Sequence, residues 1–167
     1  MSLLPVDDAL AQILKGVKPL SAEDVPLSNA SGRVLSGPLK AQRAQPPFAA
    51  SAMDGYAVRA ADITDVPVTL KVIGDAPAGH GFSGRVGKGK AVRIFTGAPV
   101  PKGADTVVIQ ENTETGGKNA VTVLEPATPG SFVRHAGLDF KTGETLRPRH
   151  TVMGARQIGL AAAMTHA

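Results

Sequence analysis

Three segments of this sequence carry polar side chains that could serve a binding or catalytic site. In the first, the carboxylate of Asp54 sits among small residues, which would let another surface approach it closely. In the second, Thr96 places a hydroxyl at the predicted end of a strand, before a rigid loop that contains two prolines. In the third, Arg134 and Asp139 bring a guanidinium and a carboxylate close together in the sequence. A carboxylate, a hydroxyl and a guanidinium together suit an oxygen-rich anionic ligand.

Each of these segments also has a purely structural interpretation. Asp54-Gly55 is a common turn pair, and Thr96-Gly97 is an ordinary way to end a strand. Arg134 and Asp139 could form a surface ion pair worth ~0–1 kcal/mol. Taken singly, each segment therefore favours structure over function.

Two glycine-rich motifs resemble nucleotide-binding loops, but their context argues against that function. Residues 79–84 match G-x-G-x-x-G, yet Arg85 and the glycines after it cannot start the helix that holds a pyrophosphate. Residues 84–90 match most of a P-loop, but Ala91 follows and has no hydroxyl for Mg²⁺. We interpret both stretches as loops of a β-rich region.

The composition excludes several other classes of site. The sequence has no cysteine, which removes disulfides and thiolate metal sites, and its four histidines lack metal-ligand spacing. A net charge of +4 could favour an anionic ligand or nucleic acid but is too small to choose between them. Aromatic residues do not alternate with basic ones as single-strand nucleic-acid surfaces require. No basic leader or long apolar run precedes or interrupts the domain, so we expect a cytoplasmic protein without membrane contact.

The elements that must position these residues follow from hydrophobic spacing. Apolar residues at helical intervals predict a first helix from Val6 to Val17, a helical turn at 30–35 and a last helix within 151–164, capped by Thr151 or its neighbour. Between them, β-branched runs predict short strands. These strands cover residues 66–72, 91–95, 106–110 and 120–124, with a hairpin turn at 115–119 between the last two.

This order predicts an α+β, mostly β protein. Residues 46–141 would form a small barrel-like module, inserted into an elongated α/β segment that residues 1–45 and 142–167 build together.

The motifs resemble one known family. Ser-Ala-Met-Asp-Gly-Tyr-Ala-Val-Arg at 51–59 and Arg-Ile-Phe-Thr-Gly-Ala-Pro-Val-Pro at 93–101 are similar to strings in the molybdopterin molybdenumtransferases, the molybdenum-insertion enzymes that include the C-terminal domain of gephyrin. The resemblance extends from Val6 to Ala163. It implies a homodimer formed through the elongated segment, and a reaction that inserts molybdate into adenylated molybdopterin with Mg²⁺.

The resemblance also assigns roles to the polar residues. Asp54, Thr96, Arg134 and Asp139 would line a cleft that faces the pterin-binding domain of the other subunit. Asp54 and Asp139 could contact Mg²⁺ or orient water. Arg134 suits a phosphate or molybdate oxyanion, and Thr96 one hydrogen bond.

Some positions depart from the family pattern. Ala49-Ala50 stand where the family often has Asp-Asn, and Leu138 stands where a Glu is common. The glycine-rich loops of the pterin-binding domain are not among residues 1–167, so we expect this chain to be inactive by itself. Two alternatives remain, a dimerisation or interaction module without catalysis and an oligonucleotide-binding barrel.

Overall fold

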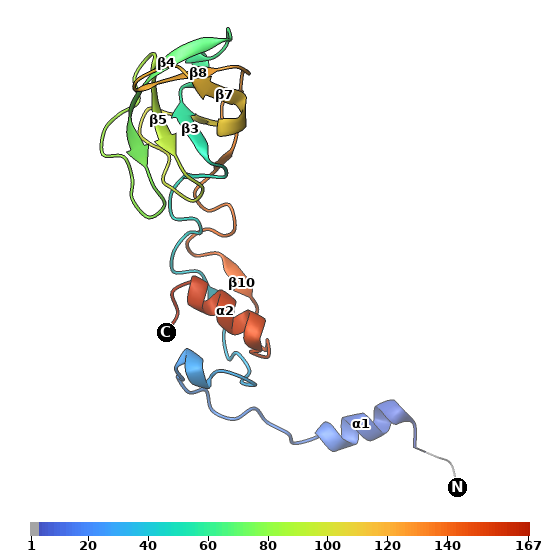
Figure 1. Ribbon diagram of the computed structural model, residues 1–167. Helices are drawn as coiled ribbons and strands as arrows, with labels where there is room; N and C mark the ends of the chain where they lie inside the picture. Colours follow the sequence, from blue (N-terminus) through green and yellow to red (C-terminus); the bar gives the residue numbers. More distant parts are fainter. Residues whose placement is uncertain (1–3) are drawn as a thin grey trace.

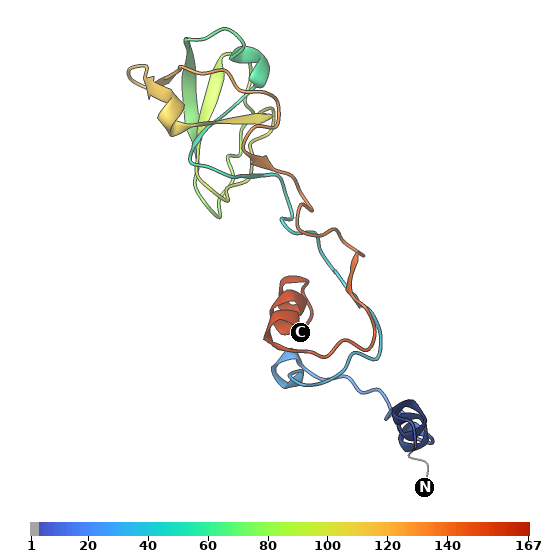
Figure 2. The same ribbon diagram turned by 90° about the vertical axis from the view of Figure 1, so that its right-hand side faces the viewer.

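A computed structural model describes residues 4–167, so the first three residues of the predicted 1–45 segment lie outside the described part. The molecule is elongated (Figure 1), with a β module at one end and helix α2 (Ala155–Ala163) below it. Two segments of the chain run side by side between these parts and form a narrow connection. The view turned by 90° (Figure 2) shows the same connection. Helix α1 (Val6–Leu14) lies at the far end of an extended arm.

The β module is built on one curled sheet of six strands, in the order β6-β3-β5-β4-β8-β7. All neighbours pair antiparallel except β4 and β5, which are parallel. Together with the two helices, this sheet confirms the predicted mostly β fold class. The strands are β3 (Gly55–Val58), β4 (Val68–Ala76), β5 (Lys90–Ile94), β6 (Thr106–Ile109), β7 (Thr113–Thr115) and β8 (Ala120–Val123).

Small aliphatic side chains fill the space on both faces of this sheet. Val107 packs in one buried cluster with Val92 and Ile94, whereas its neighbour Val108 packs in another with Ile63. Successive side chains of a strand point to opposite faces, so this division shows that both faces of β6 are covered. Burial on both faces explains why its sequence, Thr-Val-Val-Ile, lacks polar alternation.

The narrow connection consists of paired short strands. β2 (Ala50–Ser51) pairs with β9 (Val133–Arg134), and β1 (Leu39–Lys40) pairs with β10 (Thr145–Arg147). Below them, a third buried cluster joins residues from both ends of the chain, including Leu39, Phe140 and Met164. The chain therefore enters and leaves the β module through the same connection.

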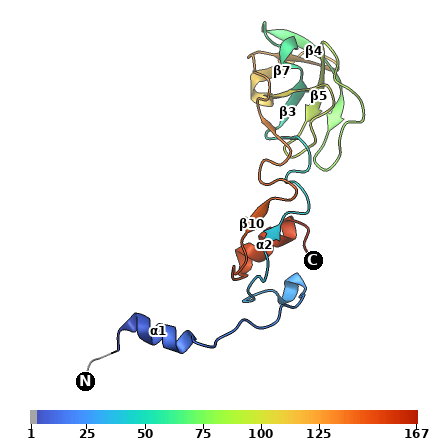
Figure 3. The same cartoon turned by 180° about the vertical axis from the view of Figure 1, so that it is seen from behind.

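Helix α1 makes none of these contacts. It has no buried residue, and its apolar side chains are open to solvent, with Val6 82%, Leu10 52% and Ile13 72% exposed. Seen from behind (Figure 3), it lies well away from α2 and from the β module. Neither helix in the described part of the chain is long and apolar enough to span a membrane.

Three local predictions were wrong. Residues 30–35 are not helical, because Val34 bridges to Val152, and the 3-10 turn η1 lies earlier, at Leu27–Asn29. The predicted hairpin between strands 106–110 and 120–124 does not form. The turn at 116–119 joins the short strand β7 to β8, and β6 pairs with β3. Thr151 does not cap α2: its hydroxyl donates to the carbonyl of Pro148, and the helix begins after Gly154.

The two glycine-rich loops behave as predicted. Residues 79–84 form turns and bends after β4, and residues 84–89 lead directly into β5. Neither loop precedes a helix, so neither has the geometry that holds a nucleotide phosphate.

Candidate functional site

Asp54 lies at a tight turn between β2 and β3. The Ser51 hydroxyl, fully buried, donates to the carbonyl of Met53 at 2.6 Å and accepts a longer hydrogen bond from the amide of Met53 at 3.4 Å. The next residue, Gly55, lies directly against the backbone of Val108 in β6. The small residues around Asp54 thus let another surface approach, and that surface is the protein's own sheet.

The carboxylate of Asp54 binds Thr96 through one oxygen. Oδ1 accepts from the Thr96 amide at 2.7 Å and from the Thr96 hydroxyl at 2.8 Å. Oδ2 accepts no hydrogen bond from any residue within 4–167, so it is available to a ligand. The two Thr96 donors, amide first, stabilise the ionised carboxyl and lower the pKa of Asp54; the nearby Arg93 adds a smaller effect.

The loop that carries Thr96 is fastened to the turn that carries Asp54. The Gly97 amide donates to the carbonyl of Ser51 at 2.9 Å, and the Ser51 amide donates to the carbonyl of Ala98 at 2.9 Å. One step further, the Val100 amide donates to Ala49 at 2.8 Å. Backbone pairing therefore brings the two segments together, although they are 42 positions apart in the sequence.

Arg93 supports the same place and was not among the predicted site residues. Its guanidinium lies 5.2 Å from the ring centroid of Tyr56 and 4.9 Å from that of Phe95. It donates to the Gly55 carbonyl at 3.2 Å and to the Gln110 side chain at 2.7 Å. Arg93 stands opposite Tyr56 across β3 and β5. The available sequence signal was its position three residues before Thr96, within the quoted 93–101 motif.

Arg134 and Asp139 lie at other points of the connection. Arg134 pairs with Ala50 in the β2–β9 ladder, and the Asp139 amide donates to the carbonyl of Gln45 at 2.9 Å. Both side chains are exposed. The structure forms no ion pair between them, since the ion pairs within residues 4–167 join Arg33 to Glu23 and Arg59 to Asp62.

The four predicted residues are therefore arranged along one stretch of chain, the 45–54 segment. The backbone of Asp139 hydrogen-bonds to Gln45, Arg134 pairs with Ala50 between β9 and β2, and Thr96 hydrogen-bonds to Asp54. Ten residues of extended chain span at most about 30 Å. Asp54 and Thr96 are in direct contact, whereas the other two extend the row toward α2.

Comparison with known proteins identifies the family of this chain. Residues 4–165 match the model of the MoeA N-terminal region, domains I and II. The chain belongs to this family. It is 40% identical over 159 residues to Molybdopterin molybdenumtransferase 2 of Mycobacterium tuberculosis, covering 93% of this chain and 38% of that protein. It is 41% identical over 145 residues to Molybdopterin molybdenumtransferase of a Nostoc species, covering 84% and 33%.

A solved structure shares the fold over nearly the whole chain. The molybdopterin biosynthesis moeA protein of Pyrococcus horikoshii superimposes with a TM-score of 0.91 at 34% identity, over 98% of this chain and 44% of that one. The chain thus spans less than half the length of the relatives it matches. The resemblance to the molybdopterin molybdenumtransferases is confirmed for this N-terminal region.

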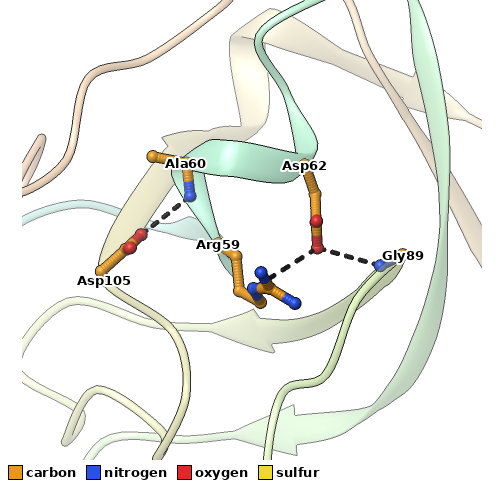
Figure 4. Close-up of polar contacts among 5 residues, drawn as sticks. All are labelled: Arg59, Ala60, Asp62, Gly89 and Asp105. Carbon is orange, nitrogen blue, oxygen red and sulfur yellow. Dashed lines mark hydrogen bonds and ion pairs between the residues drawn. The ribbon is translucent and has the colours of Figure 1, made fainter.

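In this MoeA-type chain, a second group of carboxylates lies in the β module and serves the fold. Asp62, in the 3-10 turn η2 (Ala60–Asp62), accepts from the Gly89 amide at 2.9 Å and lies 3.9 Å from Arg59. Asp105 accepts from the Ala60 amide at 2.8 Å, and Figure 4 shows these three contacts. These carboxylates bind backbone amides, which accounts for them structurally. Nowhere within residues 4–167 do three His, Cys, Asp or Glu side chains gather as a metal site would need.

The positions expected to depart from the family pattern, Ala49, Ala50 and Leu138, lie on the same connection. Ala50 is buried in β2, between Arg134 on one side and Pro99 on the other. Ala49 is half-buried, and its carbonyl accepts from Val100. Leu138 is 60% exposed, next to Asp139. The alanines therefore pack within the connection, whereas Leu138 presents an apolar group at its surface.

Proposed function

We propose that this chain is the part of a molybdopterin molybdenumtransferase that presents polar groups to a pterin-bearing partner domain. The observation that carries the proposal is the Asp54–Thr96 pair, in which one carboxylate oxygen is fixed and the other is free. A carboxylate held in this way keeps its charge and its direction. The names of the relatives supply the class of substrate, molybdopterin and molybdate.

Each residue has a distinct role in this proposal. The free Oδ2 of Asp54 orients a water molecule or contacts Mg²⁺, and Thr96 fixes the carboxylate that does so. The guanidinium of Arg134 binds an oxyanion of molybdate or phosphate, and the Asp139 carboxylate lies further along the row.

This chain could supply only part of the ligand set of a magnesium ion. Asp54 and Asp139 contact different ends of the 45–54 segment, so each offers one carboxylate rather than a joint ligand set. Mg²⁺ commonly binds through one or two carboxylates, waters and substrate phosphates, and it would neutralise phosphate charge.

A homodimer and a cytoplasmic location belong to the same proposal. The exposed apolar side chains of α1 support a protein partner, because Val6, Leu10 and Ile13 lie on a helix that has no buried residue in the described part of the chain. The same observation favours the second candidate function, an interaction module without catalysis. The division into a dimerisation segment (1–45 and 142–167) and an inserted module (46–141) stays a prediction.

The test is a chimera. In Molybdopterin molybdenumtransferase 2 of Mycobacterium tuberculosis, this chain would replace the matching region, to which it is 40% identical. We expect the chimera to hydrolyse adenylated molybdopterin in a molybdate-dependent manner, and Asp54→Asn to lower its turnover at least tenfold. The 167-residue chain alone should give no turnover.

Two outcomes would contradict the proposal. A folded, dimeric chimera without activity, beside an active parent enzyme, would favour the interaction module. An active chimera in which Asp54→Asn has no effect would make Asp54 a turn residue only. The matched control is Asp62→Asn, because Asp62 lies in the β module and has no proposed role in turnover.

A further inference from the structure

A hollow lies where the connection meets α2, and Asp139 belongs both to its lining and to the candidate site. Its volume is about 720 Å³, which is within the range of small-molecule sites. Four of its lining residues are polar, namely Arg43, Gln45, Asp139 and Arg147. The other lining residues are apolar, namely Phe140, Leu146, Leu160, Ala162 and Ala163.

The two arginines in this hollow have unused capacity. Arg43 donates to the Gln45 side chain at 3.0 Å, and Arg147 donates to the Leu146 carbonyl at 2.6 Å. A guanidinium has five N–H donors, so most remain free. No carboxylate in the described part of the chain lies within 4.0 Å of either guanidinium, although Asp139 lines the same hollow.

These charges select a ligand with a single anionic group. Two guanidinium groups favour a tetrahedral oxyanion, which accepts the parallel hydrogen bonds of arginine. Asp139 would repel a second anionic group on the same ligand. The apolar lining adds a preference for a hydrophobic body, since contact with Leu146 and Leu160 removes apolar surface from water.

We propose that the hollow bounded by Arg43 and Arg147 binds a small phosphate monoester with an apolar organic part. The hollow includes Gln45, at the start of the 45–54 segment, whereas the Asp54–Thr96 pair lies at the end of that segment. The hollow does not depend on molybdate insertion, because the 167-residue chain contains all of its residues.

The experiment is an NMR titration of the 167-residue chain with phenyl phosphate and, separately, with inorganic phosphate. For an open site we expect a dissociation constant on the order of 1 mM for phenyl phosphate, with weaker binding of inorganic phosphate. Amides of residues 43–45, 139–140 and 146–147 should shift, while those of β3 and β5 stay in place.

Three variants test the named groups. Arg147→Gln should weaken phenyl phosphate at least tenfold, and Arg147→Lys should weaken it less, because the charge remains while the planar donors are lost. Asp139→Asn should tighten binding by removing a like charge. Arg156→Gln is the control, since this exposed arginine of α2 does not line the hollow.

Clear results would overturn the proposal. They are the absence of saturable shifts with either phosphate, an equal loss in Arg147→Gln and Arg156→Gln, or equal binding of the two phosphates. The spectrum of each unliganded variant separates lost binding from lost folding. A failure here would leave the chimera experiment untouched.

Discussion

Replacing Gly55 by alanine should damage the sheet at the point that positions Asp54. An alanine Cβ at this position would lie 1.9 Å from the carbonyl oxygen of Val108 and 2.9 Å from its carbonyl carbon. Real Cβ atoms essentially never come within 3.0 Å of such atoms, so β3 and β6 would have to separate by about 1.1 Å. The four residue pairs of their ladder, from Gly55↔Ile109 to Val58↔Thr106, would be strained together.

The expected cost is about 3 kcal/mol of unfolding free energy, at the upper end for an overpacked site. For a chain of this length, that corresponds to a decrease in melting temperature of about 6–12 °C. Urea unfolding followed by far-UV circular dichroism would measure the free energy, and a thermal scan the temperature.

Gly87→Ala is the matched control for this measurement. It makes the same chemical change in the same β module, where the nearest atom to the new Cβ would be the flexible Lys90 side chain at 4.0 Å. Its effect should stay within about 0.5 kcal/mol. A loss below about 1 kcal/mol for Gly55→Ala, or an equal loss for Gly87→Ala, would refute the close-approach argument.

Three further predictions concern charge and helix formation. Thr96→Val should raise the pKa of Asp54 measured by carboxyl NMR, and Arg93→Gln should raise it less, because the Thr96 hydroxyl that valine lacks lowers this pKa more than Arg93 does, while the amide donor of residue 96 stays in place. The pKa of Asp54 is lower in the folded state than in the unfolded state, so its contribution to stability is present above the unfolded pKa and is lost as pH falls through the folded pKa. The difference in unfolding free energy between wild type and Asp54→Asn should therefore shrink in acid. A difference that does not depend on pH would contradict this. Gly159→Ala should stabilise the chain by about 0.5–1 kcal/mol in urea unfolding, since Gly159 lies inside α2 with no atom within 4 Å of the new Cβ, whereas destabilisation would indicate an unseen contact.

The sequence predicted most of the longer elements of this fold because their signals are local, but it did not predict the strand β3. The β-branched runs at 90–94, 106–109 and 120–123 mark strands in any context, and the apolar spacing of Val6 to Leu14 marks a helix. The strands β1, β2, β9 and β10, each of two or three residues, have no such signal. They exist through pairing alone, and Ala50 finds Arg134 from 84 positions away. No short window of sequence contains that information.

The candidate site divides in the same way. The Asp54 turn could be predicted from Asp-Gly and its small neighbours, and Thr96 at the end of β5 from the strand before it. Their hydrogen bond could not, because it depends on how β2 and the 96–100 loop pair. Arg93 was missed because its position between two aromatic rings depends on the β3–β5 register. An arginine in a strand gives no local sign of such a partner.

The 45–54 segment explains why residues so far apart in the sequence belong to one surface. Its residues hydrogen-bond in turn to the stretches that carry Asp139, Arg134 and Thr96, and it ends at Asp54 itself. These contacts use backbone groups except at the Asp54–Thr96 pair. Side chains along the row can therefore change while the register holds. Ala49 and Ala50 are paired through their backbone groups, and neither side chain is needed to keep the segment paired. This explains how the fold keeps its geometry with alanine at both positions.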